Sequence, residues 1–322
     1  MMGIQIRRCL LPLLALAVTM PLTLTCTTLE PIVVTRVVYQ TVETTPRIVQ
    51  VTATSAPTLP PTETPEPAAI PTPSLDGFPT HPAPLKTVIP NVDPTCTEDG
   101  AVRTFSVDLS TSESRIRFQI YLPPCYEQQP SSFYPVIFLL HSAGGRCLTW
   151  NQNGAAEVAN RLIRNGQVPP FILVTPGFGV LDDKCATLSN DFVPQVDDRF
   201  RTLSHPRHRG VGGASSGGHL AACMAFQFPE QFGSAGVFGG GIFAEHIESF
   251  NNWIDRTPQQ QRPRVLVDIG DQDDMMPFTD VLTRTLTQRD IPYTLIVEPG
   301  GHSFEYWASH LEMYYLWFAE DW

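Results

Sequence analysis

A serine lies at the centre of a glycine-rich turn, Gly213-Ala214-Ser215-Ser216-Gly217-Gly218. An apolar run at 209–212 precedes this turn, and a segment with a helical pattern at 219–228 follows it. A serine on a tight turn between a strand and a helix needs neighbours without Cβ atoms, because the two elements approach each other closely there. In this context the Gly-x-Ser-x-Gly pattern predicts a nucleophile elbow with Ser215 as the nucleophile. Ordinary turns also use this pattern, so a base, an acid and an oxyanion hole must be found elsewhere.

Composition divides the 322 residues into an N-terminal segment and a globular part. The 31 prolines are densest in the first ninety residues. We expect residues 27–90, rich in Thr and Pro, to form a disordered linker, because such a segment cannot bury enough apolar surface to fold. A globular domain should span residues 91–322. The formal net charge of −11 argues against nucleic acid or an anionic membrane surface as the main partner.

Residues 1–26 resemble a bacterial lipoprotein signal peptide. Arg7 and Arg8 precede an apolar run at 9–24 that is short for a membrane span, and Cys26 follows the run. The resemblance implies that Cys26 becomes lipidated, so that the protein is a bacterial cell-surface lipoprotein whose only membrane contact is this anchor. The alternative is an ordinary cleaved signal peptide and a secreted protein. Both predictions place the mature protein outside the cytoplasm.

Beyond residue 90, strand patterns alternate with helix patterns. Alternating residues predict an antiparallel pair of strands at 102–109 and 115–122, and apolar runs predict buried strands at 135–140, 171–175, 209–212, 234–238, 264–269 and 293–297. Helices are expected at 153–164, 191–203, 219–228, 278–290 and 303–318. Alternation of this kind predicts a mostly parallel sheet of about eight strands with helices on both faces, which is an α/β-hydrolase architecture.

Three predicted loops carry the residues of a possible catalytic triad. Ser215 follows one strand, an acidic turn at 270–274 follows another, and His302 follows the last. Functional residues of such sheets lie beyond the carboxyl ends of the strands, and the order Ser, Asp, His is the one that α/β-hydrolases use. His302 would accept the proton of Ser215, and a carboxylate would hold the imidazole. The acidic turn offers three carboxylates, Asp271, Asp273 and Asp274.

Residues 105–322 resemble the esterase D-type family of α/β-hydrolases. The motifs that carry the resemblance are Leu139-Leu140-His141, Asp197-Asp198-Arg199-Phe200, the elbow, residues 228–234, Gly270-Asp271-Gln272-Asp273 and residues 301–307. The resemblance implies that Asp273, in a Gly-x-x-Asp turn, is the acid, with Asp274 as the fallback. It implies no cofactor and no metal. We assign three other histidines, His205, His208 and His219, to the surface or to packing.

An oxyanion hole needs two backbone N–H groups, one of them from the residue after the nucleophile. That residue is Ser216, and the second donor should come from the loop at 141–145, where we assign Ala143. Ser142 stands where the family has glycine, so this loop would be strained if the position required a positive φ.

Gly239 is a second departure from the family, because relatives often have serine at this position. The change to glycine would either enlarge the pocket or be neutral.

Five cysteines remain once Cys9 and Cys26 are assigned to the signal segment. An oxidising compartment favours disulfides. Cys147 and Cys185 both lie in loops after consecutive strands, on the side of the predicted site, so we expect them to pair. Cys96 could pair with Cys125 at the start of the domain. Cys223, at an apolar position of a helix, is expected to be a free thiol.

Together these features predict an exported serine esterase that hydrolyses small-molecule or polysaccharide-linked esters. The same residues would serve an acyltransferase of the mycolyltransferase type. A noncatalytic surface-binding domain on a hydrolase scaffold is a third possibility, although all three triad positions are filled.

Overall fold

The computed structural model describes residues 50–51, 95–110, 115–179 and 183–322. The predicted signal segment, with Cys26, and most of the predicted linker lie outside the described residues. Within the linker, Gln50–Val51 forms a short strand, β1, that pairs antiparallel with β9 and was not predicted. In the described part of the chain, no helix has the length and hydropathy that crossing a membrane requires.

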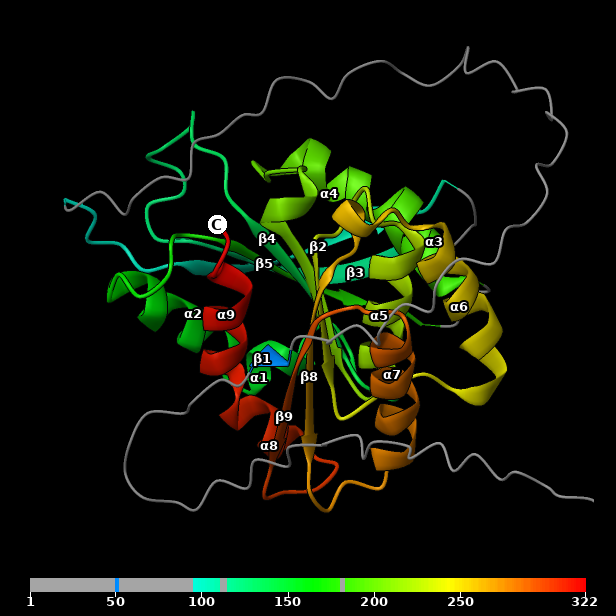
Figure 1. Ribbon diagram of the computed structural model, residues 1–322. Helices are drawn as coiled ribbons and strands as arrows, with labels where there is room; N and C mark the ends of the chain where they lie inside the picture. Colours follow the sequence, from blue (N-terminus) through cyan, green and yellow to red (C-terminus); the bar gives the residue numbers. More distant parts are fainter. Residues whose placement is uncertain (1–49, 52–94, 111–114, 180–182) are drawn as a thin grey trace, which may run out of the picture. The chain divides into compact units, whose positions relative to one another are not determined.

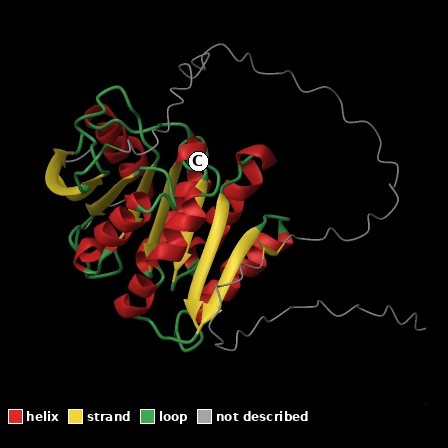
Figure 2. Ribbon diagram, turned by 90° about the vertical axis from the view of Figure 1, so that its left-hand side faces the viewer, coloured by secondary structure: helices red, strands yellow, loops and turns green. Residues whose placement is uncertain are grey.

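One twisted sheet runs through the domain (Figure 2). Its strands lie in the order β1-β9-β8-β7-β6-β4-β5-β3-β2. After β1, the strands are β2 Ala101–Asp108, β3 Arg115–Leu122, β4 Val136–Leu140, β5 Ile172–Gly177, β6 Arg209–Ala214, β7 Ser234–Phe238, β8 Arg264–Gly270 and β9 Tyr293–Glu298. The six strands from β4 to β9 are parallel, whereas β3 pairs antiparallel with both β2 and β5. This arrangement confirms the predicted α/β-hydrolase fold.

Helices cover both faces of the sheet. The α-helices are α1 Thr149–Gln152, α2 Ala155–Arg164, α3 Lys184–Thr187, α4 Val193–Arg199, α5 Ser216–Gln227, α6 Ile247–Arg256, α7 Met276–Gln288, α8 Phe304–Ser309 and α9 Leu311–Ala319. In Figure 1, α2 and α9 lie to the left of the sheet, and α5, α6 and α7 lie to the right. Helix α6 was not predicted, and the helix expected at 303–318 is divided into α8 and α9 at His310.

Alternate residues of the central strands face different hydrophobic layers. In β4, Phe138 belongs to the same buried cluster as Ala221 of α5, whereas its neighbour Leu139 belongs to the cluster that contains Tyr315 of α9. All five residues of β4 are buried. Burial of one such apolar side chain contributes about 1.5–3 kcal/mol. The central strands are therefore apolar on both faces, which is why continuous apolar runs predicted them correctly.

The disulfides differ in part from those expected. The structure joins Cys96 to Cys125 and Cys185 to Cys223, and Cys147 is a buried free thiol. The predicted bridge from Cys147 to Cys185 is therefore wrong, as is the free thiol predicted at Cys223. Cys185 and Cys223 share one hydrophobic cluster, on the face that α5 covers. Cys147 lies instead beside the end of β5, next to Thr175 and Gly177. The prediction assumed that cysteines in neighbouring loops would meet, whereas these two loops hold their cysteines apart.

Candidate active site

Ser215 lies at the turn between β6 and α5, with a φ of 55° and a ψ of −118°. A positive φ costs a residue with a Cβ atom about 1–3 kcal/mol, so the surroundings must hold the turn in place. The N–H of Ser215 donates to the carbonyl of Phe238 at 2.8 Å. A Cβ at Gly217 would come within 2.6 Å of the carbonyl oxygens of Leu140 and His141, so only glycine fits there. The turn thereby presents Ser215 at the carboxyl end of the parallel strands.

His302 connects Ser215 with Asp273. Its Nε2 lies 2.9 Å from Oγ of Ser215, and its Nδ1 lies 2.9 Å and 3.0 Å from the two carboxylate oxygens of Asp273. The Asp273 side chain is fully buried, whereas that of His302 is 30% exposed. Oδ1 of Asp273 also accepts a hydrogen bond from the N–H of Met275 at 2.8 Å. Because the carboxylate favours a proton on Nδ1, Nε2 is left to accept a proton from the serine hydroxyl.

The other two carboxylates of the acidic turn have different surroundings. Asp271 links the acidic turn at 270–274 to the loop before His302, since its Oδ1 accepts a hydrogen bond from the N–H of Gly300 at 3.1 Å. The N–H of Gln272 adds a bond to the carbonyl of Gly300 at 2.8 Å. Asp274 is exposed. In the described part of the chain, Asp273 is thus the carboxylate that accepts a hydrogen bond from Nδ1 of His302. The hydrogen bond by which Asp271 links the two loops was not predicted.

Both predicted oxyanion donors lie in backbone that follows neighbouring strands. Ser216 is the first residue of α5, so its N–H has no acceptor within the helix. Ala143 lies in a turn after β4 that is closed by a hydrogen bond from the N–H of Gly145 to the carbonyl of Ser142, at 3.0 Å. The positive φ of this turn, 75°, falls on Gly144 and not on Ser142, so Ser142 causes no strain of that kind. The donor roles of Ser216 and Ala143 stay predictions.

Trp307 lies beside His302, and no sequence motif predicted a role for its side chain. Its indole meets the imidazole of His302 edge to face, with ring centroids 5.0 Å apart. Gly239 leaves room for it, because a Cβ there would lie 2.6 Å from the indole nitrogen and 2.9 Å from Oδ2 of Asp273. A φ of 55° also favours glycine at this position. Gly239 is therefore required by the packing of Trp307, and serine would not fit without a shift.

Asp273, Asp274 and His302 bring possible metal ligands within 4.8 Å of one another. Both ring nitrogens of His302 already have partners, however, in Asp273 and Ser215. A metal ion on this histidine would have to break one of those hydrogen bonds. The arrangement of donors suits proton transfer better than metal binding.

Residues 186–318 match the family model described as "Putative esterase". An endo-1,4-beta-xylanase/feruloyl esterase of Xylanibacter ruminicola is 28% identical over 152 residues, which make up 41% of this chain and 21% of that protein. Over residues 186–318 the domain is similar to the esterases that this family model describes. These matches confirm the resemblance to esterase D-type enzymes. The matched region spans 21% of the length of the Xylanibacter ruminicola protein.

Solved esterase structures share the fold of this domain. A ferulic acid esterase superposes with a TM-score of 0.64 at 21% identity, covering 70% of this chain and 99% of that one. An S-formylglutathione hydrolase from Staphylococcus aureus superposes with a TM-score of 0.59 at 14% identity, covering 69% of this chain and all of that one (100%). At these identities the likeness establishes the fold and not the substrate.

Proposed function

We propose that the domain is a serine esterase that hydrolyses carboxylic esters through an acyl-enzyme. The observation that carries this proposal is the chain of hydrogen bonds from Asp273 through His302 to Ser215. In the first half of the reaction, Nε2 of His302 takes the hydroxyl proton while Oγ of Ser215 bonds to the ester carbonyl carbon. The same nitrogen then gives that proton to the departing alcohol oxygen as the ester bond breaks.

Water completes the cycle. It loses a proton to Nε2 of His302 and bonds to the carbonyl carbon of the acyl-enzyme. The tetrahedral intermediate then releases the carboxylic acid, and Ser215 regains its proton from His302. Asp273 stabilises the imidazolium in both halves, and the N–H groups of Ser216 and Ala143 would donate to the oxyanion. No metal or organic cofactor takes part in this proposal.

Feruloyl esters are the first natural substrates to test, because relatives in sequence and in structure carry that name. An alcohol could replace water in the second half-reaction, which would make the domain an acyltransferase. Product analysis with and without added alcohol distinguishes these outcomes. A noncatalytic domain would give neither product.

The decisive experiment compares two adjacent serines. The purified domain should hydrolyse p-nitrophenyl acetate and react with a fluorophosphonate probe, and both activities should disappear in Ser215→Ala. Ser216→Ala is the matched control, because it keeps the backbone N–H that the oxyanion hole would use. Turnover or labelling that survives in Ser215→Ala would refute Ser215 as the nucleophile.

We further propose that the protein is exported and anchored through Cys26. The support is the basic, apolar segment that ends at Cys26, together with the two disulfides, which suit an oxidising compartment. Cys26→Ala should move the protein from the membrane fraction to the soluble fraction. Protein that stays with the membranes would contradict the anchor.

A further inference from the structure

A pocket of about 290 Å³ opens beside the loop that carries Ala143. Its lining includes Arg117 of β3, His141, Arg146 and Leu148 from the segment after β4, and Gly177 and Phe178 at the end of β5. Strands β4 and β6 are parallel neighbours in the sheet, with Leu140 opposite Gly213. The pocket and Ser215 therefore lie at the same end of adjacent strands, where the strand order reverses and α/β folds bind ligands.

The shape of the pocket follows from the residues at its base. Arg117 lies opposite Gly177 in the register of β3 and β5, and Gly177 has no side chain to fill the space. His141 and Phe178 stack with ring centroids 4.1 Å apart and form a flat wall. Burial lowers the pKa of His141, although a hydrogen bond with the Ser142 carbonyl opposes this effect. The imidazole is then neutral near pH 7, and the charged groups among the described lining residues are the two guanidinium groups of Arg117 and Arg146.

Within the described residues, the guanidinium groups of the two arginines of this pocket have no hydrogen-bond or ion-pair partner. Among the arginines that the structure describes, the guanidinium groups of Arg117, Arg146 and Arg256 alone make no hydrogen bond or ion pair. No acidic residue is among the described residues that line the pocket. Two of the three unpaired arginines thus face one cavity in a chain whose net charge is −11.

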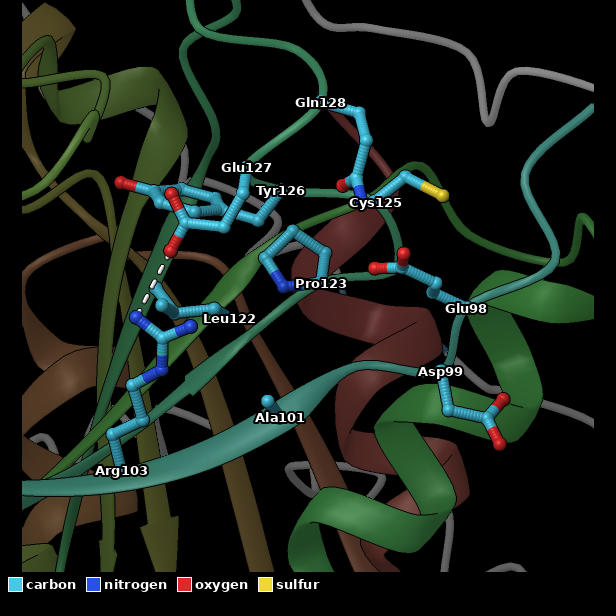
Figure 3. Close-up of a pocket in the computed structure, with 10 residues that line it drawn as sticks. All are labelled: Glu98, Asp99, Ala101, Arg103, Leu122, Pro123, Cys125, Tyr126, Glu127 and Gln128. Atoms are coloured by element: carbon cyan, nitrogen blue, oxygen red, sulfur yellow. Dashed lines mark hydrogen bonds and ion pairs between the residues drawn. The ribbon is translucent and has the colours of Figure 1, made fainter.

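A second pocket shows the usual situation of an arginine in this domain. It measures about 50 Å³ and lies beside the Cys96–Cys125 bridge (Figure 3). Its lining contains one arginine, Arg103, whose guanidinium pairs with Glu127 at 2.9 Å. Two more carboxylates, of Glu98 and Asp99, line this smaller pocket. Among its described lining residues, the larger pocket has two arginines and no carboxylate.

We propose that Arg117 and Arg146 bind a carboxylate of the ester substrate, an inference that rests on the proposed esterase function. Guanidinium groups match carboxylates in geometry and form charge-assisted hydrogen bonds with them. The pocket begins one to two strand spacings from Ser215 and extends to Arg117 on β3, three spacings away. A carboxylate bound between Arg117 and Ser215 would therefore lie about 5–10 Å from the reacting carbonyl. The stacked rings of His141 and Phe178 would contact the apolar part of the substrate between these two groups.

Two pairs of esters test this proposal. Mono-(4-nitrophenyl) adipate, compared with its neutral methyl ester, carries the carboxylate on the acyl side. For the alcohol side, 3-acetoxybenzoate is compared with methyl 3-acetoxybenzoate. We expect kcat/KM of one anionic ester to exceed that of its neutral partner by about tenfold or more, because a hydrogen bond to a charged group contributes about 1.5–3 kcal/mol. The pair that shows the preference identifies the side of the ester that enters the pocket.

Arginine variants show whether the pocket causes the preference. The double variant Arg117→Gln/Arg146→Gln should lose it while retaining kcat/KM for the neutral esters. Arg256→Gln is the matched control, since it removes the third unpaired arginine, at the end of α6. An unchanged preference in the double variant, or an equal loss in Arg256→Gln, would overturn the proposal. Should the double variant not fold, the two single variants decide, each being expected to lower the preference.

The neutral esters separate failure of this inference from failure of the proposed function. Hydrolysis of neutral and anionic esters at equal kcat/KM would refute the carboxylate site alone. Absence of hydrolysis for every ester, with no fluorophosphonate labelling, would refute the esterase and with it the carboxylate site.

Discussion

Nε2 of His302 lies 2.9 Å from Oγ of Ser215, although 87 residues separate them along the chain. The other imidazole nitrogen bonds to Asp273, so loops after β6, β8 and β9 meet at one point. The three side chains should therefore act as a unit, in which removal of Ser215 or His302 alone costs about as much as removal of all three, and removal of Asp273 costs less.

The acidic member of this unit can be identified with two variants. Asp273→Asn should lower kcat for p-nitrophenyl acetate by about 10⁴-fold, because asparagine favours the wrong tautomer of His302. Asp274→Asn removes the exposed neighbouring carboxylate and should lower kcat by about fivefold at most, since an exposed charge pair contributes about 1 kcal/mol or less. Similar losses of kcat in the two variants would contradict the assignment of Asp273.

Gly239→Ala should impair catalysis, whereas Gly166→Ala should not. Both glycines have a positive φ, 55° and 67°, so alanine should cost about 1–2 kcal/mol of unfolding free energy at each. Nothing lies within 4 Å of a Cβ at Gly166, whereas a Cβ at Gly239 would meet Trp307 and Asp273. A displacement of about 1 Å in the triad can cost about 10²-fold in rate. Urea unfolding and kcat are the measurements, and equal kcat values would show that Trp307 can move without disturbing His302.

The disulfide pattern can be read by peptide mapping without reduction. We expect one peptide pair linked through Cys185 and Cys223, and alkylation of Cys147 only after unfolding. The double variant Cys185→Ala/Cys223→Ala should lose about 4 kcal/mol of unfolding free energy, because the bridge closes a loop with a sequence separation of 38. Cys147→Ala, which leaves both bridges intact, is the control. A peptide that joins Cys147 to Cys185 would refute this pattern.

A buried polar cluster gathers around Asp268 on β8. This carboxylate accepts hydrogen bonds from the hydroxyl groups of Tyr306, at 2.9 Å, and of Tyr314, and it lies 3.0 Å from Nδ1 of His310. Nε2 of His310 lies 3.1 Å from Glu298. Burial lowers the pKa of His310, but the hydrogen bond and charge of Asp268, together with Glu298, outweigh burial and raise this pKa above its ordinary value of 6.5.

The raised pKa makes the stabilising effect of His310 depend on pH. Because the folded state binds the proton more tightly, this contribution is fully present below the unfolded pKa and is lost as pH rises through the folded pKa. His310→Gln should therefore lower the unfolding free energy more at about pH 5.5 than at about pH 8.5. Urea unfolding of both proteins at the two pH values measures the difference. A cost that does not change with pH would contradict this prediction.

The sequence predicted the central strands well because each of them is a short run of apolar residues. Strands such as β4 are buried on both faces, and a run of apolar residues signals that burial directly. No local sequence pattern predicts the division of the last helix at His310. The imidazole of His310 hydrogen bonds to Asp268 on β8, which is far from it in the sequence. Helix α6 buries only Phe250 and Ile254, so its apolar pattern is sparse.

The amino-acid sequence by itself determined the fold class, the elbow around Ser215 and the order in which serine, acid and histidine follow their strands. Tertiary structure alone decided which cysteine joins Cys185 and why Gly239 leaves room for Trp307. The residue pattern left three carboxylates open beside His302, of which the family resemblance implied Asp273, and the structure places Asp273 against the imidazole. The reason is physical. Periodicity and turn residues act over a few neighbouring positions, whereas these pairings depend on which side chains point to the same place once distant strands are side by side.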